Sequence, residues 1–126
     1  MEVLLRTPVS RAPALAIFGA GETFHAPHLI DLEVAAVLRR LARLGVIGDA
    51  RASTTLSDLR AMRLGRYPHT ALLPRIWALR DNVTAHDASH VALADLLGAI
   101  LFTRDQRLGK AAGHLVRIEV IGDAPG

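Results

Sequence analysis

Apolar residues follow two alternating patterns along the chain: helical spacing, and short runs of strand length. The clearest helical pattern covers Leu29–Leu44 and ends at Gly45. Thr84 can cap a second helix over Ala85–Leu97, which Gly98 stops. Further helices are predicted over Arg11–Phe18, Asp49–Leu64, His69–Arg80 and Asp105–Ala112, and strands over Thr23–Ala26, Ala99–Thr103 and Val116–Ile121.

Three of these segments carry local signals. Asp49 can cap the helix that it opens, and Gly65–Pro68 forms a short extended connection. Pro74 marks either the true start of the helix over His69–Arg80 or a kink within it. Strands separated by helices predict an α/β fold, with a mainly parallel sheet between two layers of helices. Ligands of such sheets bind beyond the carboxyl ends of the strands, where Asp105 follows an apolar strand by two positions.

The length of 126 residues fits one domain over residues 1–126. Hydrophobic residues make up 51%, which excludes a disordered chain, and the absence of cysteine excludes disulfides, thiol nucleophiles and cysteine-ligated metals. The longest apolar run, Val91–Phe102, is interrupted by Asp95 and is too short to span a bilayer. We also find no signal peptide pattern, so we expect a cytoplasmic protein.

The charge balance neither excludes nor specifically indicates nucleic acid as a partner. Lysine and arginine number 15 against 12 acidic residues, a net charge of +3, and every basic residue except Lys110 is arginine. Arginine matches phosphate well, but no run of adjacent basic residues exceeds Arg39-Arg40.

Three acids stand where solubility does not explain them. Glu33 lies among apolar neighbours one helical turn away, where a carboxylate is costly unless it is paired or bound to a cation. Asp87 lies in the first turn of its helix, and Asp105 follows a strand. Each also has a purely structural interpretation: Glu33 pairs with an arginine such as Arg40, and the two aspartates stabilise helix starts. Their joint placement favours convergence on one crevice.

An all-oxygen cluster suits Mg²⁺ or Mn²⁺ and, with it, phosphodiester hydrolysis. A rival interpretation is a zinc hydrolase built on His86 and His90, which are four residues apart on one helix. That spacing lacks the glutamate of the H-E-x-x-H signature and needs a third ligand from elsewhere, so the carboxylate site is favoured.

The sequence resembles the PIN-domain toxins of type II toxin–antitoxin pairs, the VapC family. Four stretches, in order and spacing, carry the resemblance over nearly the whole chain: HAPHLIDLEV (25–34), RYPHTALLPRIWALRDNVTAHDASHVALADLLGA (66–99), LFTRDQRL (101–108) and VRIEV (116–120). The intervals from Glu33 to Asp87 (87 − 33 = 54) and from Asp87 to Asp105 (105 − 87 = 18) match the family pattern.

The resemblance implies a three-layer PIN-like fold and a Mg²⁺- or Mn²⁺-dependent ribonuclease that cleaves RNA of the tRNA or rRNA class. It further implies inhibition by a VapB-type antitoxin and a homodimer within the toxin–antitoxin complex. Glu33, Asp87 and Asp105 match the family's second, third and fourth acids, and Thr103 matches a hydroxyl residue beside the site. By that match Asp87 is the strongest metal ligand. Glu33 and Asp105 hold metal-bound waters and orient the water that attacks the phosphodiester.

One departure from the family concerns the amino terminus. Family members begin with a central strand that ends in the first metal-binding aspartate, whereas residues 1–8 here correspond to the helix after that strand. Glu2 lies too late to replace the missing acid. Two explanations are open. Either the native protein begins upstream, or the chain is truncated, with a damaged metal site and a gap in its sheet. A truncated chain would be a module that binds an antitoxin without cleaving RNA. We favour the first, because the other acids are present. A second departure is at His86 and His90, where the family tends to have aromatic or apolar residues; we expect neutral variation there.

We therefore predict that the genomic DNA preceding the Met1 codon encodes, in frame, a short apolar strand ending in aspartate. The intact mass of the native protein should then exceed 13.5 kDa by roughly ten residues. A stop codon directly before Met1 would contradict this prediction.

Overall fold

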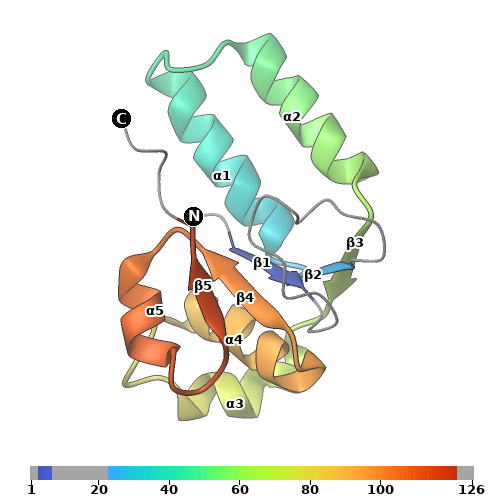
Figure 1. The fold of residues 1–126 in the computed structure, drawn as a ribbon. Helices are drawn as coiled ribbons and strands as arrows, with labels where there is room; N and C mark the ends of the chain where they lie inside the picture. Colours follow the sequence, from blue (N-terminus) through green and yellow to red (C-terminus); the bar gives the residue numbers. More distant parts are fainter. Residues whose placement is uncertain (1–2, 7–22, 122–126) are drawn as a thin grey trace.

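The central sheet has five strands in the order β3-β2-β1-β4-β5 (Figure 1). The computed structural model describes residues 3–6 and 23–121, and every structural statement below concerns those residues. The strands are β1 (Val3–Arg6), β2 (Phe24–Pro27), β3 (Leu64–Tyr67), β4 (Ile100–Thr103) and β5 (Ile118–Val120).

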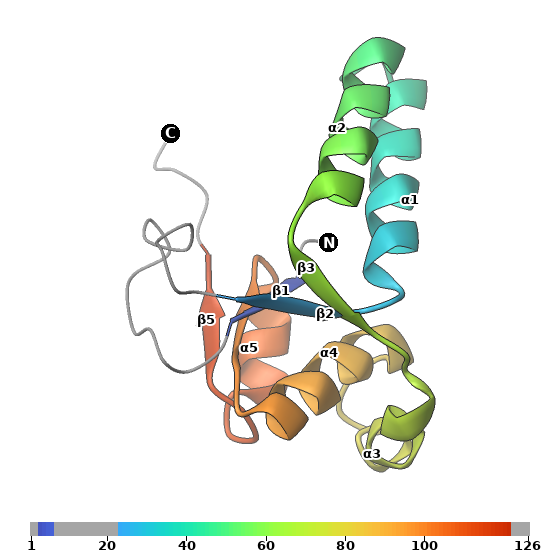
Figure 2. The same ribbon diagram turned by 90° about the vertical axis from the view of Figure 1, so that its right-hand side faces the viewer.

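Helices cover both faces of this sheet. Helices α1 (Ile30–Arg43) and α2 (Asp49–Ala61) form a hairpin that stands out from one face, whereas α3 (Leu73–Ala78), α4 (Ala85–Leu97) and α5 (Gln106–Ala112) lie on the other (Figures 1 and 2). The short 3₁₀ helix η2 (Thr70–Leu72) leads into α3. The predicted α/β fold with three layers is therefore confirmed.

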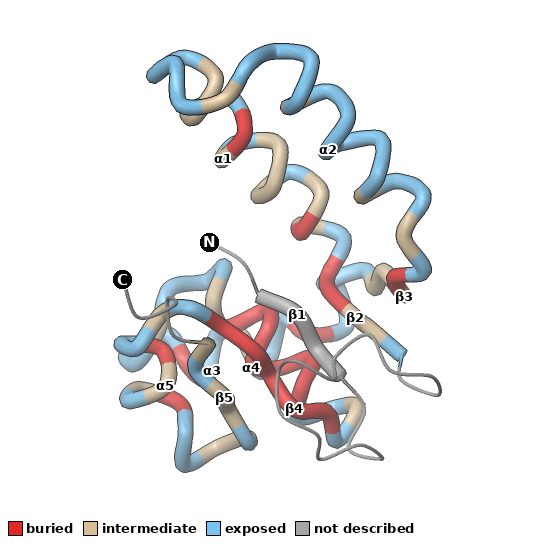
Figure 3. The backbone as a smooth tube through the Cα atoms, turned by 45° about the horizontal axis from the view of Figure 1, so that its top comes forward, coloured by how far each residue is buried: buried red, intermediate tan, exposed pale blue. Residues whose placement is uncertain are grey.

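The core lies between α4 and β4, the two elements with the most buried residues, drawn red in Figure 3. Val91 and Leu93 of α4 pack in one buried cluster with Leu101 of β4 and Leu108 of α5. By contrast, α2 has no buried residue. The acid-bearing helix α4 is thus held firmly, because apolar burial is the main stabilising contribution in such a core.

Strand directions locate the edge of the sheet where a site is expected. β2 is parallel to β3, and β4 is parallel to β5, while β1 is antiparallel to both β2 and β4. Four strands therefore share one direction, so the mainly parallel sheet is confirmed. Helix α1 follows the carboxyl end of β2 and α5 follows that of β4, which brings both connections to the same edge.

The helix expected over residues 1–8 is wrong for residues 3–6, the described part of that range, and the gap in the sheet that the truncation alternative implied is filled. Val3–Arg6 forms β1, with Val3 opposite Thr103 on one side and Leu5 opposite His25 on the other. The physical reason is that β2 and β4 would otherwise face each other with unpaired backbone groups. The run Val3–Leu5 is apolar and suits that central position. The helix predicted over Arg11–Phe18 lies outside the described residues.

Several predicted boundaries also change. The helix that begins at Asp49 ends at Ala61, and Gly48 rather than Asp49 is its N-cap residue, with no side-chain cap. The expected connection Gly65–Pro68 is largely the edge strand β3, because it pairs with β2. In the segment His69–Arg80, Pro74 lies in the first turn of α3, so it marks a helix start.

The prediction for α4 is confirmed at both ends. The Asp87 backbone N–H donates to the Thr84 side-chain oxygen at 3.2 Å, and Gly98 ends the helix with a φ of 61°. This left-handed conformation favours glycine, since it has no Cβ to clash with the backbone.

A bidentate ion pair fixes the start of α1. The Arg66 guanidinium donates to both carboxylate oxygens of Asp31, at 2.8 and 2.9 Å, and to the Leu59 carbonyl at 3.0 Å. One side chain of β3 thereby joins α1 to α2. Because Glu33 follows Asp31 by two residues, this contact also restricts where Glu33 can lie.

Candidate active site

Asp87 and Asp105 line the same groove, at the edge of the sheet formed by the carboxyl ends of the strands. The groove has a volume of about 550 Å³, and Thr84, Arg80 and Arg107 also line it. Asp87 comes from the first turn of α4, and Asp105 from the turn between β4 and α5. The structure thus brings together two acids that are 18 residues apart (105 − 87 = 18) in the sequence.

The position of Asp87 raises the pKa of its carboxyl group. Burial is the largest cause, and the negative charges of Asp105 and Glu33 act in the same direction. The hydrogen bond with Thr84 and the nearby His90 partly oppose them. Glu33 and Asp105 are therefore both close enough to Asp87 for their charges to act on it.

Asp105 serves its own helix as well as the groove. Its Oδ1 accepts a hydrogen bond from the Arg107 backbone N–H at 2.9 Å, which caps α5. The Asp105 backbone N–H donates to the Thr103 hydroxyl oxygen at 3.0 Å, and Thr103 is fully buried. The structural interpretation of Asp105 is therefore correct, and it leaves the second carboxylate oxygen available to the groove.

Glu33 has a partner that the sequence did not suggest. The His90 ring nitrogen Nε2 lies 2.8 Å from Glu33 Oε1, and the exposed fractions of the two side chains are 0% and 15%. Because an ionised carboxylate only accepts, Nε2–H donates. The suggested pairing of Glu33 with Arg40 is wrong. His90 itself was a signal, because it is a polar residue next to the apolar positions Val91, Leu93 and Ala94 of α4.

The same contact overturns the zinc interpretation of His86 and His90. His90 is buried with its Nε2 committed to Glu33, whereas His86 is exposed. Buried Nδ1 of His90 has no hydrogen-bond partner among the described residues. His86 and His90 therefore lie in different surroundings, one exposed and the other buried against Glu33, and no group of three possible ligands includes them among the described residues.

The carboxylates that line the groove belong to the chemical type of ligand that hard cations bind. Carboxylate oxygens are the ligands that Mg²⁺ and Mn²⁺ prefer, and a bound cation would offset both the burial of the Asp87 charge and its repulsion from Asp105 and Glu33. No three His, Asp or Glu side chains in the described ranges are, however, arranged close enough to hold one ion. Glu33 does not line the groove itself.

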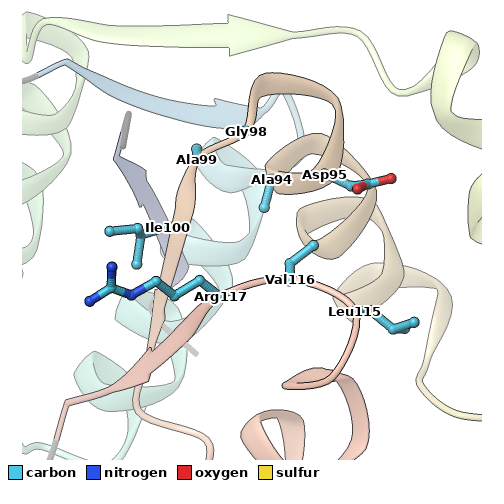
Figure 4. Close-up of a pocket in the computed structure, with 8 residues that line it drawn as sticks. All are labelled: Ala94, Asp95, Gly98, Ala99, Ile100, Leu115, Val116 and Arg117. Carbon is cyan, nitrogen blue, oxygen red and sulfur yellow. The ribbon is translucent and has the colours of Figure 1, made fainter. Parts of the chain in front are cut away.

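A second hollow lies at the opposite edge of the sheet (Figure 4). It has a volume of about 250 Å³ and lies between the end of α4 and the amino ends of β4 and β5. Its two charged lining residues are Asp95 and Arg117. Each is paired already, Asp95 with Arg75 at 3.6 Å and Arg117 with Glu119 at 3.2 Å. This hollow therefore has no pair of acids like Asp87 and Asp105, and its one acid, Asp95, is already in an ion pair.

Comparison with known families matches residues 2–114 to the PIN domain. This chain belongs to the PIN-domain family. Known relatives refine the assignment, because the PIN domain here is 46% identical to Ribonuclease VapC9 of Mycobacterium tuberculosis over 102 residues, which is 81% of this chain and 80% of that protein.

Two more relatives from Mycobacterium tuberculosis extend the match. Ribonuclease VapC12 is 33% identical over 121 residues, 96% of this PIN domain and 92% of its own length. Ribonuclease VapC1 is 41% identical over 98 residues, 77% of this chain and 74% of its own. The predicted membership of the VapC family is confirmed. In the described ranges of the PIN domain, no helix could cross a membrane.

The raised pKa of Asp87 gives a test by pH. Because the Asp87 carboxyl ionises less readily in the folded state, the folded protein loses stability as pH rises through the folded pKa of Asp87. The variant Asp87→Asn has no such carboxyl and should not show this loss of stability. In EDTA, the Tm of the variant minus that of the parent should increase between about pH 4 and pH 7. Thermal melts at fixed ionic strength measure it, and a difference that stays constant over this range would contradict it.

The contact between His90 and Glu33 gives a test by double-mutant cycle. Urea unfolding of His90→Ala, Glu33→Ala and the double variant should give a coupling free energy of about 1–2 kcal/mol, because each single change removes the same hydrogen bond. His86→Ala combined with Glu33→Ala is the control and should be additive. Additivity for the His90 pair would show that the contact does not form in solution.

Proposed function

We propose that this PIN-domain protein is the toxin of a type II toxin–antitoxin pair and acts as a Mg²⁺- or Mn²⁺-dependent endoribonuclease. The convergence of Asp87 and Asp105 in one groove is the observation that carries the proposal. The ribonuclease names of relatives at 46% and 33% identity support the same chemistry.

The three acids would have separate roles. Asp87 would bind the metal most directly, because it lines the groove and is the acid whose pKa is raised, by burial first and then by the charges of Asp105 and Glu33. Asp105 would use the oxygen that does not cap α5, and Thr103 would hold the turn that presents it. Glu33, oriented by His90, would position the attacking water.

The reaction is hydrolysis of a phosphodiester bond in RNA. The water oxygen forms a bond to phosphorus, the bond from phosphorus to the leaving ester oxygen breaks, and a water proton ends on that oxygen. A bound metal supplies charge stabilisation for the phosphate oxygens and lowers the pKa of water. The acids of this chain supply the binding, the orientation and the path for the proton.

A second candidate function is a PIN module that binds an antitoxin but does not cleave RNA. It is favoured by one observation, namely that the described carboxylates do not form a three-ligand set. The two candidates make opposite predictions for RNA cleavage and the same prediction for antitoxin binding.

We infer a VapB-type antitoxin as the protein partner and a homodimer within the complex, and expect action in the cytoplasm on RNA of the tRNA or rRNA class. The exposed apolar side chains of the α1–α2 hairpin, among them Leu32 and Val46 with exposed fractions of 70% and 65%, support a protein partner. Several large exposed apolar side chains on one hairpin, here also Leu44 and Leu56, are typical of a protein interaction site.

Cleavage of RNA tests the ribonuclease proposal directly. The chain should cleave RNA with Mg²⁺ or Mn²⁺ and stop in EDTA, and Asp87→Asn should reduce the rate by at least about a hundredfold, since the main ligand is lost. Asp95→Asn, an exposed acid at the other end of α4, is the matched control and should cleave as the parent does.

Circular dichroism and Tm should show that both variants are folded. Cleavage by Asp87→Asn at the parental rate would refute the assignment of the site. A parent that binds its antitoxin but leaves RNA intact would instead select the non-cleaving module.

A further inference from the structure

The acid-lined groove also contains two arginines whose role the acid chemistry does not explain. Arg80, between α3 and α4, and Arg107, in the first turn of α5, line it together with Asp87 and Asp105. Both arginine side chains are exposed, and neither forms an ion pair with any carboxylate in the described part of the chain. Cations and anions therefore share one groove without neutralising each other.

Unpaired charges of both signs suit an anionic ligand that binds together with a cation. An RNA backbone brings anionic phosphates for guanidinium groups, while the phosphate under attack requires a cation held by the acids. If the arginines served only stability, pairing with Asp87 or Asp105 would be favourable, since all four lie in the same groove.

Arg80 is held in place before any ligand arrives. Its guanidinium carbon lies 4.6 Å from the centroid of the Trp77 ring, and its NH1 donates to the Trp77 carbonyl oxygen at 2.9 Å. Trp77 is itself exposed, with an exposed fraction of 67%, although a large aromatic side chain is usually buried. Stacking and hydrogen bonding restrict the rotamers of Arg80 and so lower the entropy cost of binding.

We propose that Arg80 and Arg107 form a clamp for RNA phosphates in the groove of Asp87 and Asp105, and that Trp77 is a positioning residue for Arg80. The inference rests on the proposed function for its substrate class, RNA. It adds which residues hold the backbone while the acids act. Each arginine contacts one phosphate other than the one that is cleaved.

The test measures RNA binding apart from cleavage. Full-length protein carrying Asp87→Asn, in EDTA, is titrated against a fluorescently labelled unstructured RNA at several salt concentrations. Arg80→Ala and Arg107→Ala should each weaken binding about tenfold at low salt, since each loses a charged hydrogen bond. Each should also reduce the slope of log K against log salt by about 0.7, the value for one phosphate on a single strand.

Arg51→Ala provides the matched control. It removes the same charge from an exposed position on α2, in the hairpin, and should leave the salt slope unchanged. Arg80→Lys keeps the charge but not the planar group that stacks on Trp77, so we expect it to restore the slope and only part of the affinity. Tm should confirm that these surface variants are folded.

The positioning role of Trp77 has its own readout. Trp77→Ala should weaken RNA binding in the presence of Arg80 and have no further effect when combined with Arg80→Ala. Trp77→Phe should restore most of the affinity, because a ring remains for stacking. Additive losses from Trp77→Ala and Arg80→Ala would overturn the positioning role.

The outcomes separate this inference from the proposed function. Arginine variants with the parental affinity and salt slope overturn the clamp, even where the unsubstituted chain cleaves RNA. Reduced slopes in a chain that cleaves nothing support the clamp and overturn the ribonuclease. Absence of RNA binding at low salt overturns the clamp as well.

Discussion

The buried hydrogen bond between His90 and Glu33 joins the two helical layers at the site. Glu33 belongs to the hairpin layer and His90 to the helix that forms the core, so this contact sets the distance between the acid of α1 and the acids of α4 and α5. A carboxylate with an exposed fraction of 15% needs such a donor, because burial without a partner costs several kcal/mol. The proposed site therefore depends on a histidine that lies outside its groove.

Local helix chemistry and the proposed catalytic chemistry use the same groups. Asp105 caps α5 with one oxygen and leaves the other for the groove, while Thr84 caps α4 just before Asp87. Helix starts favour negative charge, so they tolerate acids that repel each other better than a helix middle would. Burial, together with the remaining repulsion from Asp105 and Glu33, raises the pKa of Asp87. The charged form of Asp87 thus lowers the stability of the fold although the proposed function needs it, and a bound cation would offset this cost.

Strand β1 completes the sheet although it runs opposite to both of its neighbours. A parallel sheet interior requires hydrogen bonds on both sides of each strand, and either direction of a short apolar segment can supply them. β1 supplies them in the antiparallel direction, with Val3 beside Thr103 at the site edge. The neighbours β2 and β4 keep the spacing and direction that place α1 and α5 at that edge.

The sequence by itself determined the α/β class and the ends of α4, because helical periodicity, capping residues and glycine stops act over a few neighbouring positions. It also made the three acids candidates for the site. It also carried the order and spacing of stretches by which the chain resembles its family. Only the tertiary structure decided that residues 3–6 form a strand, that Glu33 pairs with His90, 57 residues away, and that Arg80 and Arg107 lie beside the acids. Those facts depend on contacts between distant segments, and the packing of α4 against the sheet creates them.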